Sequence, residues 1–461
     1  MIPEIKMAEN PNQKAKIAFV MWSPFHYYVY KNIARHLPES EYVVCDSWYQ
    51  TPIEAQSTVR KMTDLLQKTG AHWRILTERT DSETIEKFFD RYEIIAAVHL
   101  WSPLTSLAFD DWFSRKKSVR IKYGVGKNLP TFGPWSARFD LTLTEGEHSQ
   151  HYASLYTESH IIGIPKFDDW FNNNLDTNEI ERIKKLLNPD KKTILYLPTH
   201  GALSSLHIFN KAVCSLSDEY NVLAKLHNHN ALTESDIVSQ LEKDQRIFLF
   251  DESSDILPLF YLSDTVISDS SSASLETLLT DKPLVILDTT SDNEAYTNHQ
   301  NNREFNGYWY SGGLVYPGSI VEQIKSPQNQ IGEIVRDPSE LRSAITKSFN
   351  ALTRYKNMRD KLRRSLFSFN DGRCGERGAL IIRAFLQRDK PEPPLLGLAT
   401  RNYFVNYEKQ YRRLLQRMER ALETMKNKME AYQATYEIFD RIRRARILQK
   451  VILMVKYFLK K

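Results

Sequence analysis

The sequence predicts an α/β protein with two doubly wound parallel sheets that face one cleft. Three observations support this fold class. Short apolar segments alternate with amphipathic ones along most of the 461 residues, which is typical of parallel strands joined by helices. A polar, Asn-rich stretch divides this alternation, and the length of the chain suits two or three domains. The composition, with 41% hydrophobic and 26% charged residues, is typical of a soluble globular protein.

The first half of the chain contains seven segments with the length and apolar content of buried strands. They are residues 16–22, 42–45, 72–76, 94–99, 119–122, 141–144 and 160–162. Helices are expected between them at residues 27–37, 53–69, 81–92 and 104–114. Connections this short favour a parallel sheet flanked by helices, and we interpret residues 1–165 as the first domain.

An interdomain linker, residues 166–192, leads to a second domain at residues 193–390. The linker contains an amphipathic segment at residues 178–187. Strands of the second domain are expected at residues 193–197, 222–226, 247–250, 265–267 and 284–287. Helices are expected at residues 256–262 and 273–280, over most of 341–364, and at 376–387.

A serine-rich turn stands at the carboxyl end of the fourth of these strands, directly before a helix. Its residues are Ser268, Asp269, Ser270, Ser271 and Ser272. Hydroxyls and free backbone N–H groups at a helix N-terminus favour an anion, and ligands of α/β sheets bind beyond the carboxyl ends of the strands. The turn therefore predicts a phosphate site. The alternative is that Ser271 and Ser272 only cap the helix.

Three other loops of the second domain also follow strands and should converge on the same crevice. They contain Thr199 and His200, then His227, then residues 251–254. Imidazoles and hydroxyls beside a helix N-terminus suit a diphosphate better than a neutral ligand. A single histidine is more often structural, but His227 ends a buried strand beside this polar crevice, so we expect it to be functional.

Loops of the first domain would face the crevice from the other side. The residues of interest are His26, His99, Tyr123, Gly124 and Lys127. Gly124 and the nearby Gly126 would let a ligand approach the backbone, and Lys127 would meet a phosphate. His26 is the best-placed base on this side. The sequence has no HExxH motif, no DxD motif between strand and helix and no Cys/His cluster, so we expect no metal site.

Beyond a stiff Pro-rich linker at residues 391–394, an apolar stripe runs from Tyr411 to Phe439 with spacings that alternate four and three. This 3.5-residue repeat predicts a coiled coil within residues 391–440, and hence a homo-oligomer through residues 404–439. The alternative is a helix packed on its own body. The number of subunits stays open.

Residues 441–461 contain eight basic residues, no acidic ones and several large apolar side chains. Subtracting these eight charges from the net charge of +5 leaves about −3 for the rest, which argues against nucleic-acid binding. The segment predicts an amphipathic helix on an anionic membrane surface, and burial in an oligomer is the alternative. Three cysteines without a CxxC pair, no signal peptide and no run of 18 apolar residues predict a cytoplasmic protein, peripheral on the inner face of the membrane.

The stretch LFYLSDTVISDSSSASLETLLTDKPLVIL resembles the signature of the CDP-glycerol glycerophosphotransferase family of teichoic-acid synthesis. Four other blocks are similar to that family: IIGIPKFDDWF, TILYLPTH, LAKLHNH and NDGRCGERGALII. The resemblance covers roughly residues 117–385 and excludes the coiled coil and the basic tail.

The resemblance implies a GT-B fold, a CDP-linked donor and a lipid-linked polymer acceptor. The acceptor hydroxyl would attack the β-phosphate of the donor, CMP would leave, and no separate cofactor would be needed. His227, Ser271 and Ser272 would bind the diphosphate, while Thr199 would sit near the donor. Glu276 would take the position of an acidic helix residue of the family, and Arg377 would brace the C-terminal helix.

One departure concerns the family's His-Gly pair, which supplies the general base. Tyr123-Gly124 stands in its place, and a tyrosine with a pKa near 10 is a poor base at neutral pH. Either another residue such as His26 or His99 takes this role, or the transferred group differs. The alternatives are a GT-B glycosyltransferase that uses a CMP- or UDP-sugar for capsule or lipopolysaccharide synthesis, and a non-catalytic scaffold.

Overall fold

The computed structural model divides the chain into two compact units, Met1–Arg401 and Asn402–Lys461. It describes residues 15–45, 52–76, 87–99, 116–126, 134–227, 230, 234–244, 246–289 and 320–403, and in the second unit residues 417, 420, 421, 423–430, 433, 437, 438, 440, 441 and 449. The expected helix at residues 104–114, most of the one at 81–92, and Lys127 lie outside these residues.

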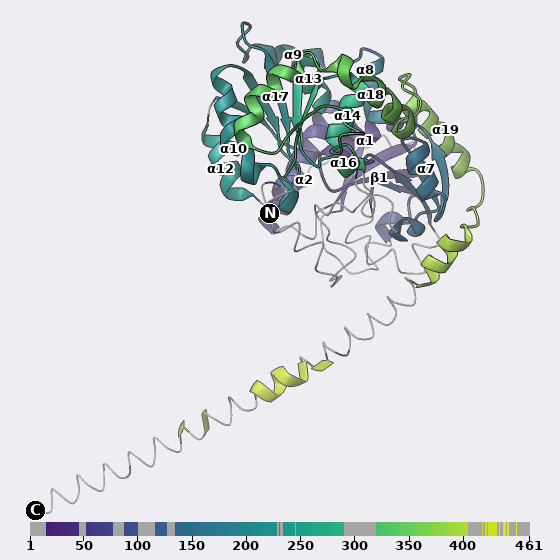
Figure 1. The fold of residues 1–461 in the computed structure, drawn as a ribbon. Coiled ribbons are helices and arrows are strands. Elements are labelled where there is room, and N and C mark those ends of the chain that lie inside the picture. The colour runs from purple at the N-terminus through teal and green to yellow at the C-terminus, as the bar shows by residue number, and fades with distance from the viewer. Residues whose placement is uncertain are drawn as a thin grey trace, which may run out of the picture. The chain divides into compact units, whose positions relative to one another are not determined.

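All seven strands expected in the first half of the chain form one parallel sheet (Figure 1). They are β1 (Ile17–Met21), β2 (Ser40–Cys45), β3 (Trp73–Leu76), β4 (Ile94–Ala97), β5 (Lys117–Ile121), β6 (Leu141–Thr144) and β7 (Glu158–Ile161). Their order is β3-β2-β1-β4-β5-β6-β7. Helices α1 (Phe25–Ala34), α2 (Pro52–Thr69) and α7 (Glu147–Ala153) and a 3-10 turn, η1 (Pro134–Arg138), connect the strands.

Both faces of this first sheet are covered, as a parallel sheet requires. Along β1, Phe19 and Met21 belong to one apolar cluster, whereas Ala18 and Val20 belong to another on the opposite face. All five residues of β1 are buried. This explains why the strand is a continuous apolar run without alternation.

The linker folds into η2 (Pro165–Phe167), α8 (Asp168–Phe171) and α9 (Thr177–Lys184), and leads to a second parallel sheet. Its strands are β8 (Thr193–Leu197), β9 (Asn221–Lys225), β10 (Ile247–Phe250), β11 (Thr265–Ser268), β12 (Leu284–Leu287) and β13 (Glu333–Val335), in the order β10-β9-β8-β11-β12-β13. Five of these were predicted. β13 was missed because this edge strand has three residues, of which only Val335 is buried.

Helices on both faces of the second sheet complete the fold. They are η3 (Gly201–Leu203), α10 (Leu206–Ser215), η4 (Leu216–Asp218), α12 (Ser235–Lys243), α13 (Ile256–Leu262), α14 (Ala273–Thr280), α16 (Ile320–Gln323), η5 (Pro338–Glu340), α17 (Leu341–Ser348) and α18 (Leu352–Leu366). The helix expected over most of 341–364 is two helices, with a break at residues 349–351. In each sheet the strand order reverses once, between β1 and β4 and between β8 and β11. Ligands of such sheets bind at this switch point.

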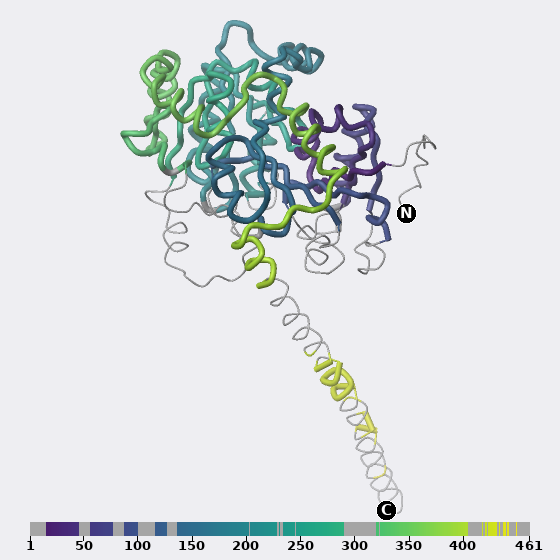
Figure 2. The backbone as a smooth tube through the Cα atoms, turned by 90° about the vertical axis from the view of Figure 1, so that its right-hand side faces the viewer, coloured from purple at the N-terminus to yellow at the C-terminus, as the bar shows by residue number. Residues whose placement is uncertain are grey.

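Helix α19 (Cys374–Leu386), near the end of the first unit, packs on α1 and the first sheet (Figure 2). A Cβ atom added to Gly375 would lie 1.9 Å from the carbonyl oxygen of Asn32, so only glycine allows this approach. The carboxylate of Asp168 accepts the N–H groups of Cys374 (2.9 Å) and Gly375 (2.6 Å) at the start of α19. The chain thus returns to the first sheet within the segment that the sequence assigns to the second domain.

The described residues of the second unit are helical and mostly exposed. Met425 and Met429, two members of the predicted coiled-coil stripe, are 67% and 71% exposed in the single chain. Most of the stripe and nearly all of residues 441–461 lie outside the described residues. Within the described part, no helix is both long enough and apolar enough to cross a membrane.

Candidate functional site

Three of the five residues of the serine turn are buried, and two of these hold the neighbouring strand and the loop that follows it. Ser268 donates its hydroxyl hydrogen to the carbonyl of Leu197 (2.8 Å). The carboxylate of Asp269 accepts the N–H of Thr199 (2.8 Å) and both the N–H (2.9 Å) and the hydroxyl (2.7 Å) of Ser205. Asp269 therefore orients the loop after β8, and the two buried side chains fix that loop to the serine turn.

Lys325 holds the third inward residue, Ser270, from behind. Its ammonium lies 2.9 Å from the Ser270 hydroxyl and 3.4 Å from the carboxylate of Asp288, which also pairs with Arg336 (3.1 Å). Lys325 and Asp288 are each only 6% exposed. This buried lysine follows α16 in sequence and was not predicted, because only the fold brings it to the end of β11.

Ser271 and Ser272 are the two members of the turn that remain partly exposed. The Ser271 hydroxyl accepts the N–H of Ala273 (3.3 Å), which is a local contact at the start of α14. Ser272 makes no capping bond within α14, and instead its hydroxyl accepts the N–H of Gly126 from the first domain (3.3 Å). The turn therefore meets the opposite loop directly.

The loop after β5 approaches the serine turn closely enough to require glycine at position 126. A Cβ atom there would lie 2.6 Å from Val321 Cγ1 and 2.8 Å from Ser272 Oγ. At Gly124 the corresponding distance to Ser272 Oγ is 3.4 Å, which is an ordinary contact. The two predicted glycines thus lie against Ser272 of the serine turn.

The two predicted histidines of the second domain lie together at the ends of β8 and β9. The rings of His200 and His227 stack with centroids 4.3 Å apart. Asn230, fully buried, fixes both loops: it accepts the N–H of His227 (2.6 Å) and donates to the carbonyl of Thr199 (2.9 Å). Glu234 in turn accepts a hydrogen bond from Asn230 (2.9 Å). The sequence did not reveal Asn230 and Glu234.

Glu276 lies in the first turn of α14 and is 7% exposed. One carboxylate oxygen pairs with Lys166 of the linker at 2.6 Å. The other oxygen has no hydrogen-bond partner in the part of the chain that the structure describes. Glu276 thus ties the linker to the helix that begins at the serine turn.

The loop after β10 contacts the first domain through charges. Lys31 on α1 lies 3.1 Å from Asp255, and Lys61 on α2 lies 3.0 Å from Asp251. The Tyr28 hydroxyl donates to the carbonyl of Ser253 (2.6 Å). The predicted loop at residues 251–254 therefore joins the two halves of the first unit.

His26 is fully buried at the start of α1, next to the end of β1. Its Nδ1 accepts the backbone N–H of Trp22 (3.3 Å), and burial lowers its pKa to about 3. The neutral ring therefore carries its hydrogen on Nε2, which has no hydrogen-bond partner among the described residues. In this tautomer Nε2 is a donor.

His99 and Tyr123 lie side by side at the ends of β4 and β5, with ring centroids 5.7 Å apart. Burial holds the pKa of His99 well below its ordinary value. Burial raises the pKa of Tyr123 to about 12, although the nearby Arg120 acts in the opposite direction. At neutral pH, Tyr123 therefore loses its proton to form the basic phenolate even less often than a free tyrosine does.

Arg377 braces the start of α19, as the family resemblance implied. Its guanidinium lies 4.2 Å from the ring centroid of Phe369 and pairs with Asp371. It also donates to the carbonyl of Ile162 at the end of β7 (3.5 Å). Among the described residues, no group of three His, Cys, Asp or Glu side chains is arranged to hold a metal ion.

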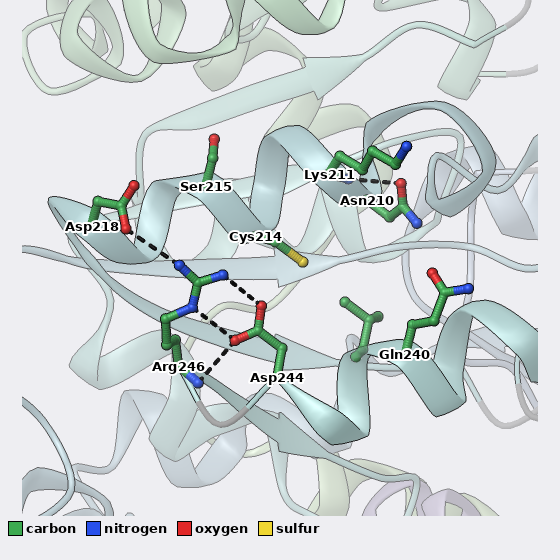
Figure 3. A pocket seen from close by; sticks show the side chains of 9 residues that line it. Asn210, Lys211, Cys214, Ser215, Asp218, Gln240, Asp244 and Arg246 are labelled. Atoms are coloured by element: carbon green, nitrogen blue, oxygen red, sulfur yellow. Dashed lines mark hydrogen bonds and ion pairs between the residues drawn. The ribbon is translucent and has the colours of Figure 1, made fainter.

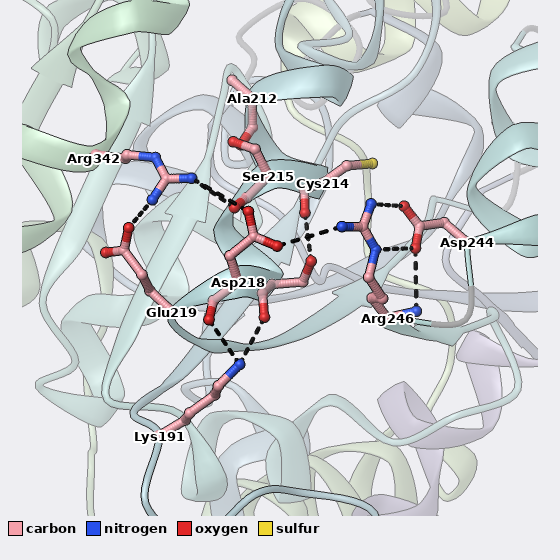
Figure 4. Close-up of polar contacts among 10 residues, drawn as sticks. Lys191, Ala212, Cys214, Ser215, Asp218, Glu219, Asp244, Arg246 and Arg342 are labelled. Atoms are coloured by element: carbon pink, nitrogen blue, oxygen red, sulfur yellow. Dashed lines mark hydrogen bonds and ion pairs between the residues drawn. The ribbon is translucent and has the colours of Figure 1, made fainter.

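A separate open pocket of about 320 Å³ lies near the amino ends of β9 and β10, away from the serine turn at the carboxyl end of β11 (Figure 3). Arg246 pairs there with Asp244 (2.9 Å) and Asp218 (3.4 Å), and Lys191 donates to the carbonyl of Asp218 (2.9 Å; Figure 4). Both charges of the Arg246–Asp218 pair are largely exposed, so it contributes little stability. We assign these contacts a structural role.

The fold defines a GT-B transferase: two doubly wound sheets, polar loops that meet at their switch points, and a helix, α19, that returns to the first sheet. The family model of the CDP-glycerol:poly(glycerophosphate) glycerophosphotransferases matches residues 143–382, just over half of the chain. The chain belongs to this family, which confirms the resemblance of its motifs. Its members build polymers, and this protein is a transferase of that kind.

Two solved structures of the wall teichoic acid polymerase TagF agree with this assignment of the fold. The wall teichoic acid polymerase TagF has a TM-score of 0.54 and 16% identity, over 81% of this chain and 90% of that chain. TagF with one substitution, soaked with CDPG, has a TM-score of 0.53 and 17% identity, over 81% and 89%. Anabaena Alr3699/HepE in complex with UDP-glucose has a TM-score of 0.49 and 13% identity, over 80% and 100%. A search of the curated proteins finds no match to the sequence.

Proposed function

We propose that this protein transfers glycerol phosphate, or a related polyol phosphate, from a CDP-linked donor to a hydroxyl of a lipid-linked acceptor, with release of CMP. The observation that carries the proposal is the position of Ser271 and Ser272. They stand at the N-terminus of α14, at the switch point of the second sheet, opposite a glycine loop of the first domain. This is where the physics of the fold favours a diphosphate.

Donor binding would replace a hydrogen bond that now joins two loops of the protein. The Ser272 hydroxyl, which accepts the N–H of Gly126, would turn to the diphosphate when the loop moves away. The stacked rings of His200 and His227 would lie beside it. Catalysis would then consist of positioning and electrostatic stabilisation of the transferred phosphoryl group, without a metal cofactor.

The acceptor side of the proposal involves the second unit. Residues 441–461 would hold the enzyme on the anionic inner face of the cell membrane, where a lipid-linked polymer is within reach. Residues 404–439 would join copies of the chain through a coiled coil, since Met425 and Met429 of the stripe are exposed in the single chain.

A second candidate is sugar transfer from a CMP- or UDP-sugar. Tyr123 favours it, because burial raises the pKa of its phenol to about 12 in the place where the family carries a histidine. Such a donor would occupy the same crevice.

The test measures CMP release from CDP-glycerol, CDP-ribitol and CMP-sugars, and UDP release from UDP-sugars, each with a lipid-linked acceptor. We expect CMP from a CDP-polyol, with a large loss of turnover in Ser272→Ala and a retained fold. Ser339→Ala, in an exposed turn far along the chain, is the matched control. Release of UDP alone would favour sugar transfer. No release with any donor would favour a non-catalytic scaffold and refute the proposal.

A further inference from the structure

Two buried side chains lie between the loops that carry His200 and His227. Asn230 is fully buried and Glu234 is 3% exposed, whereas both histidines are partly exposed. The histidines can therefore meet a ligand, while the amide and the carboxylate are shielded from solvent. Buried polar groups of this kind act through the hydrogen bonds that they make.

Asn230 and Glu234 hold the backbone on both sides of His200. The Asn230 side chain donates to the carbonyl of Thr199 (2.9 Å), which belongs to the peptide group before His200. Glu234 Oε1 accepts the N–H of Gly201 (2.6 Å), which belongs to the peptide group after His200. Both peptide groups that flank the Cα atom of His200 are thus fixed, and the φ of 70° at Gly201 favours glycine there.

The same amide also holds His227. Asn230 Oδ1 accepts the N–H of His227 (2.6 Å), and Asn230 Nδ2 donates to Glu234 Oε2 (2.9 Å). The backbone N–H of Glu234 donates to the carbonyl of Asn230 (2.8 Å), so the backbone of this segment is held as well. The two stacked rings, with centroids 4.3 Å apart, therefore depend on one hydrogen-bonded unit.

The carboxylate of Glu234 sets the direction of these hydrogen bonds. Both of its oxygens accept, and the exposed ring of His207 lies 3.3 Å from Oε1. This contact raises the pKa of His207, as an ionised carboxylate does. Because an ionised carboxylate only accepts hydrogen bonds, the nitrogen of the Asn230 amide must face Glu234, and its oxygen is left to face the N–H of His227.

We propose that Glu234 is a positioning residue for the pair of His200 and His227. Through the Asn230 amide it holds both imidazoles beside the phosphoryl group that is transferred. This inference rests on the proposed function. Groups that are held in place before the reaction stabilise the developing charge without reorganising, and a misplacement of about 1 Å can lower the rate about 10²-fold. Glu234 does not need to touch the substrate for this effect.

Glu234→Gln tests the proposal because glutamine has nearly the same size but presents one acceptor and one donor. Its NH₂ group faces either the N–H of Gly201 or the nitrogen of Asn230, and turning the Asn230 amide only moves the mismatch to His227. One of the two histidines therefore loses its support. The assay measures nucleotide release by the full-length protein from the CDP-polyol that the wild type accepts. We expect kcat to fall about 10²-fold and the KM of the donor to stay within about threefold, because the serine turn is unchanged.

Val238→Ala is the matched control. Val238 lies on α12, one turn beyond Glu234, and is 7% exposed, so its truncation lowers stability at the same helix. Its side chain makes no hydrogen bond to the histidine loops, so kcat should stay within about twofold of wild type. An equal loss of kcat in both variants would show an effect of stability alone and overturn the inference. Wild-type kcat in Glu234→Gln, or a rise in KM alone, would also overturn it.

Hydrogen exchange of the wild-type protein is a second measurement, which serves if Glu234→Gln does not fold. The N–H groups of Gly201 and His227 are bound by side chains of one unit, so both should be protected and should open with similar free energies. Exchange of either amide at the rate of an unprotected peptide would overturn the inference.

Failure of the proposed function has a different signature. If the wild-type protein releases no nucleotide with any donor, the proposed function is wrong and this inference falls with it. If the wild type releases CMP and kcat is unchanged in Glu234→Gln, the proposed function stands and only the positioning role of Glu234 is refuted.

Discussion

Gly126→Ala tests whether the contact between the glycine loop and the serine turn belongs to the working state. The added methyl group would lie 2.6 Å from Val321 Cγ1 and 2.8 Å from Ser272 Oγ, so one side of the crevice must move. Overpacking of this kind costs about 1–3 kcal/mol, which corresponds to about a 5- to 150-fold shift away from the contacted state.

Two backbone amides report this shift directly. The N–H of Gly126 donates to Ser272 Oγ and the N–H of Val321 donates to the carbonyl of Gly126, both at 3.3 Å. Hydrogen exchange at Val321 should accelerate by the same factor in Gly126→Ala. Because the proposed mode of donor binding breaks this contact, CMP release should not fall by the same factor, and such a fall would show that the contact belongs to the productive state.

Gly124→Ala is the matched control for this experiment. Its new methyl group would meet Ser272 Oγ at 3.4 Å, an ordinary van der Waals distance, so exchange and turnover should stay within about twofold of wild type. If the two variants behave alike, or if Gly126→Ala keeps wild-type exchange at Val321, then the steric reasoning is wrong.

Three other predictions concern stability and localisation. Asp269→Ala should lower the free energy of unfolding by about 3–5 kcal/mol in chemical denaturation, because the N–H groups of Thr199 and Ser205 lose a buried carboxylate; a loss below about 1 kcal/mol would contradict this. The pKa of His26 is about 3 in the folded protein and near 6.5 when unfolded, so the unfolded state binds the extra proton and stability should fall as pH drops below about 6.5. His26→Gln should flatten that slope, and an unchanged slope would refute the assignment. Deletion of residues 441–461 should abolish sedimentation with anionic vesicles, with neutral vesicles as the control; unchanged sedimentation would remove the membrane role.

Most of the strands were predictable because they are buried on both faces and therefore read as short apolar runs, as in β1, β8 and β12. Among the helices, α10 and α12 were missed, although each has a buried apolar side: Leu206, Phe209 and Val213 in α10, and Val238 and Leu241 in α12. In both helices, polar residues lie between the apolar ones, so the helical spacing of the apolar residues is hard to recognise in a single sequence.

The serine turn was predictable in position but not in orientation. Its place between a buried strand and a helix follows from local sequence. The inward direction of Ser268 and Asp269 depends on Leu197, Thr199 and Ser205, which are about 70 residues away and meet the turn only because β8 and β11 pair.

Local sequence determined which segments are strands and helices, where the polar loops follow them, and which family the motifs resemble. These properties depend on side-chain pattern over a few residues. The tertiary structure alone decided which polar groups share a buried space. Burial in the folded protein lowers the pKa of Lys122, and Gly126 meets Ser272 only because two sheets face each other. Burial and charge act through space between segments that are distant in the sequence, so a pattern over a few residues does not predict their effects.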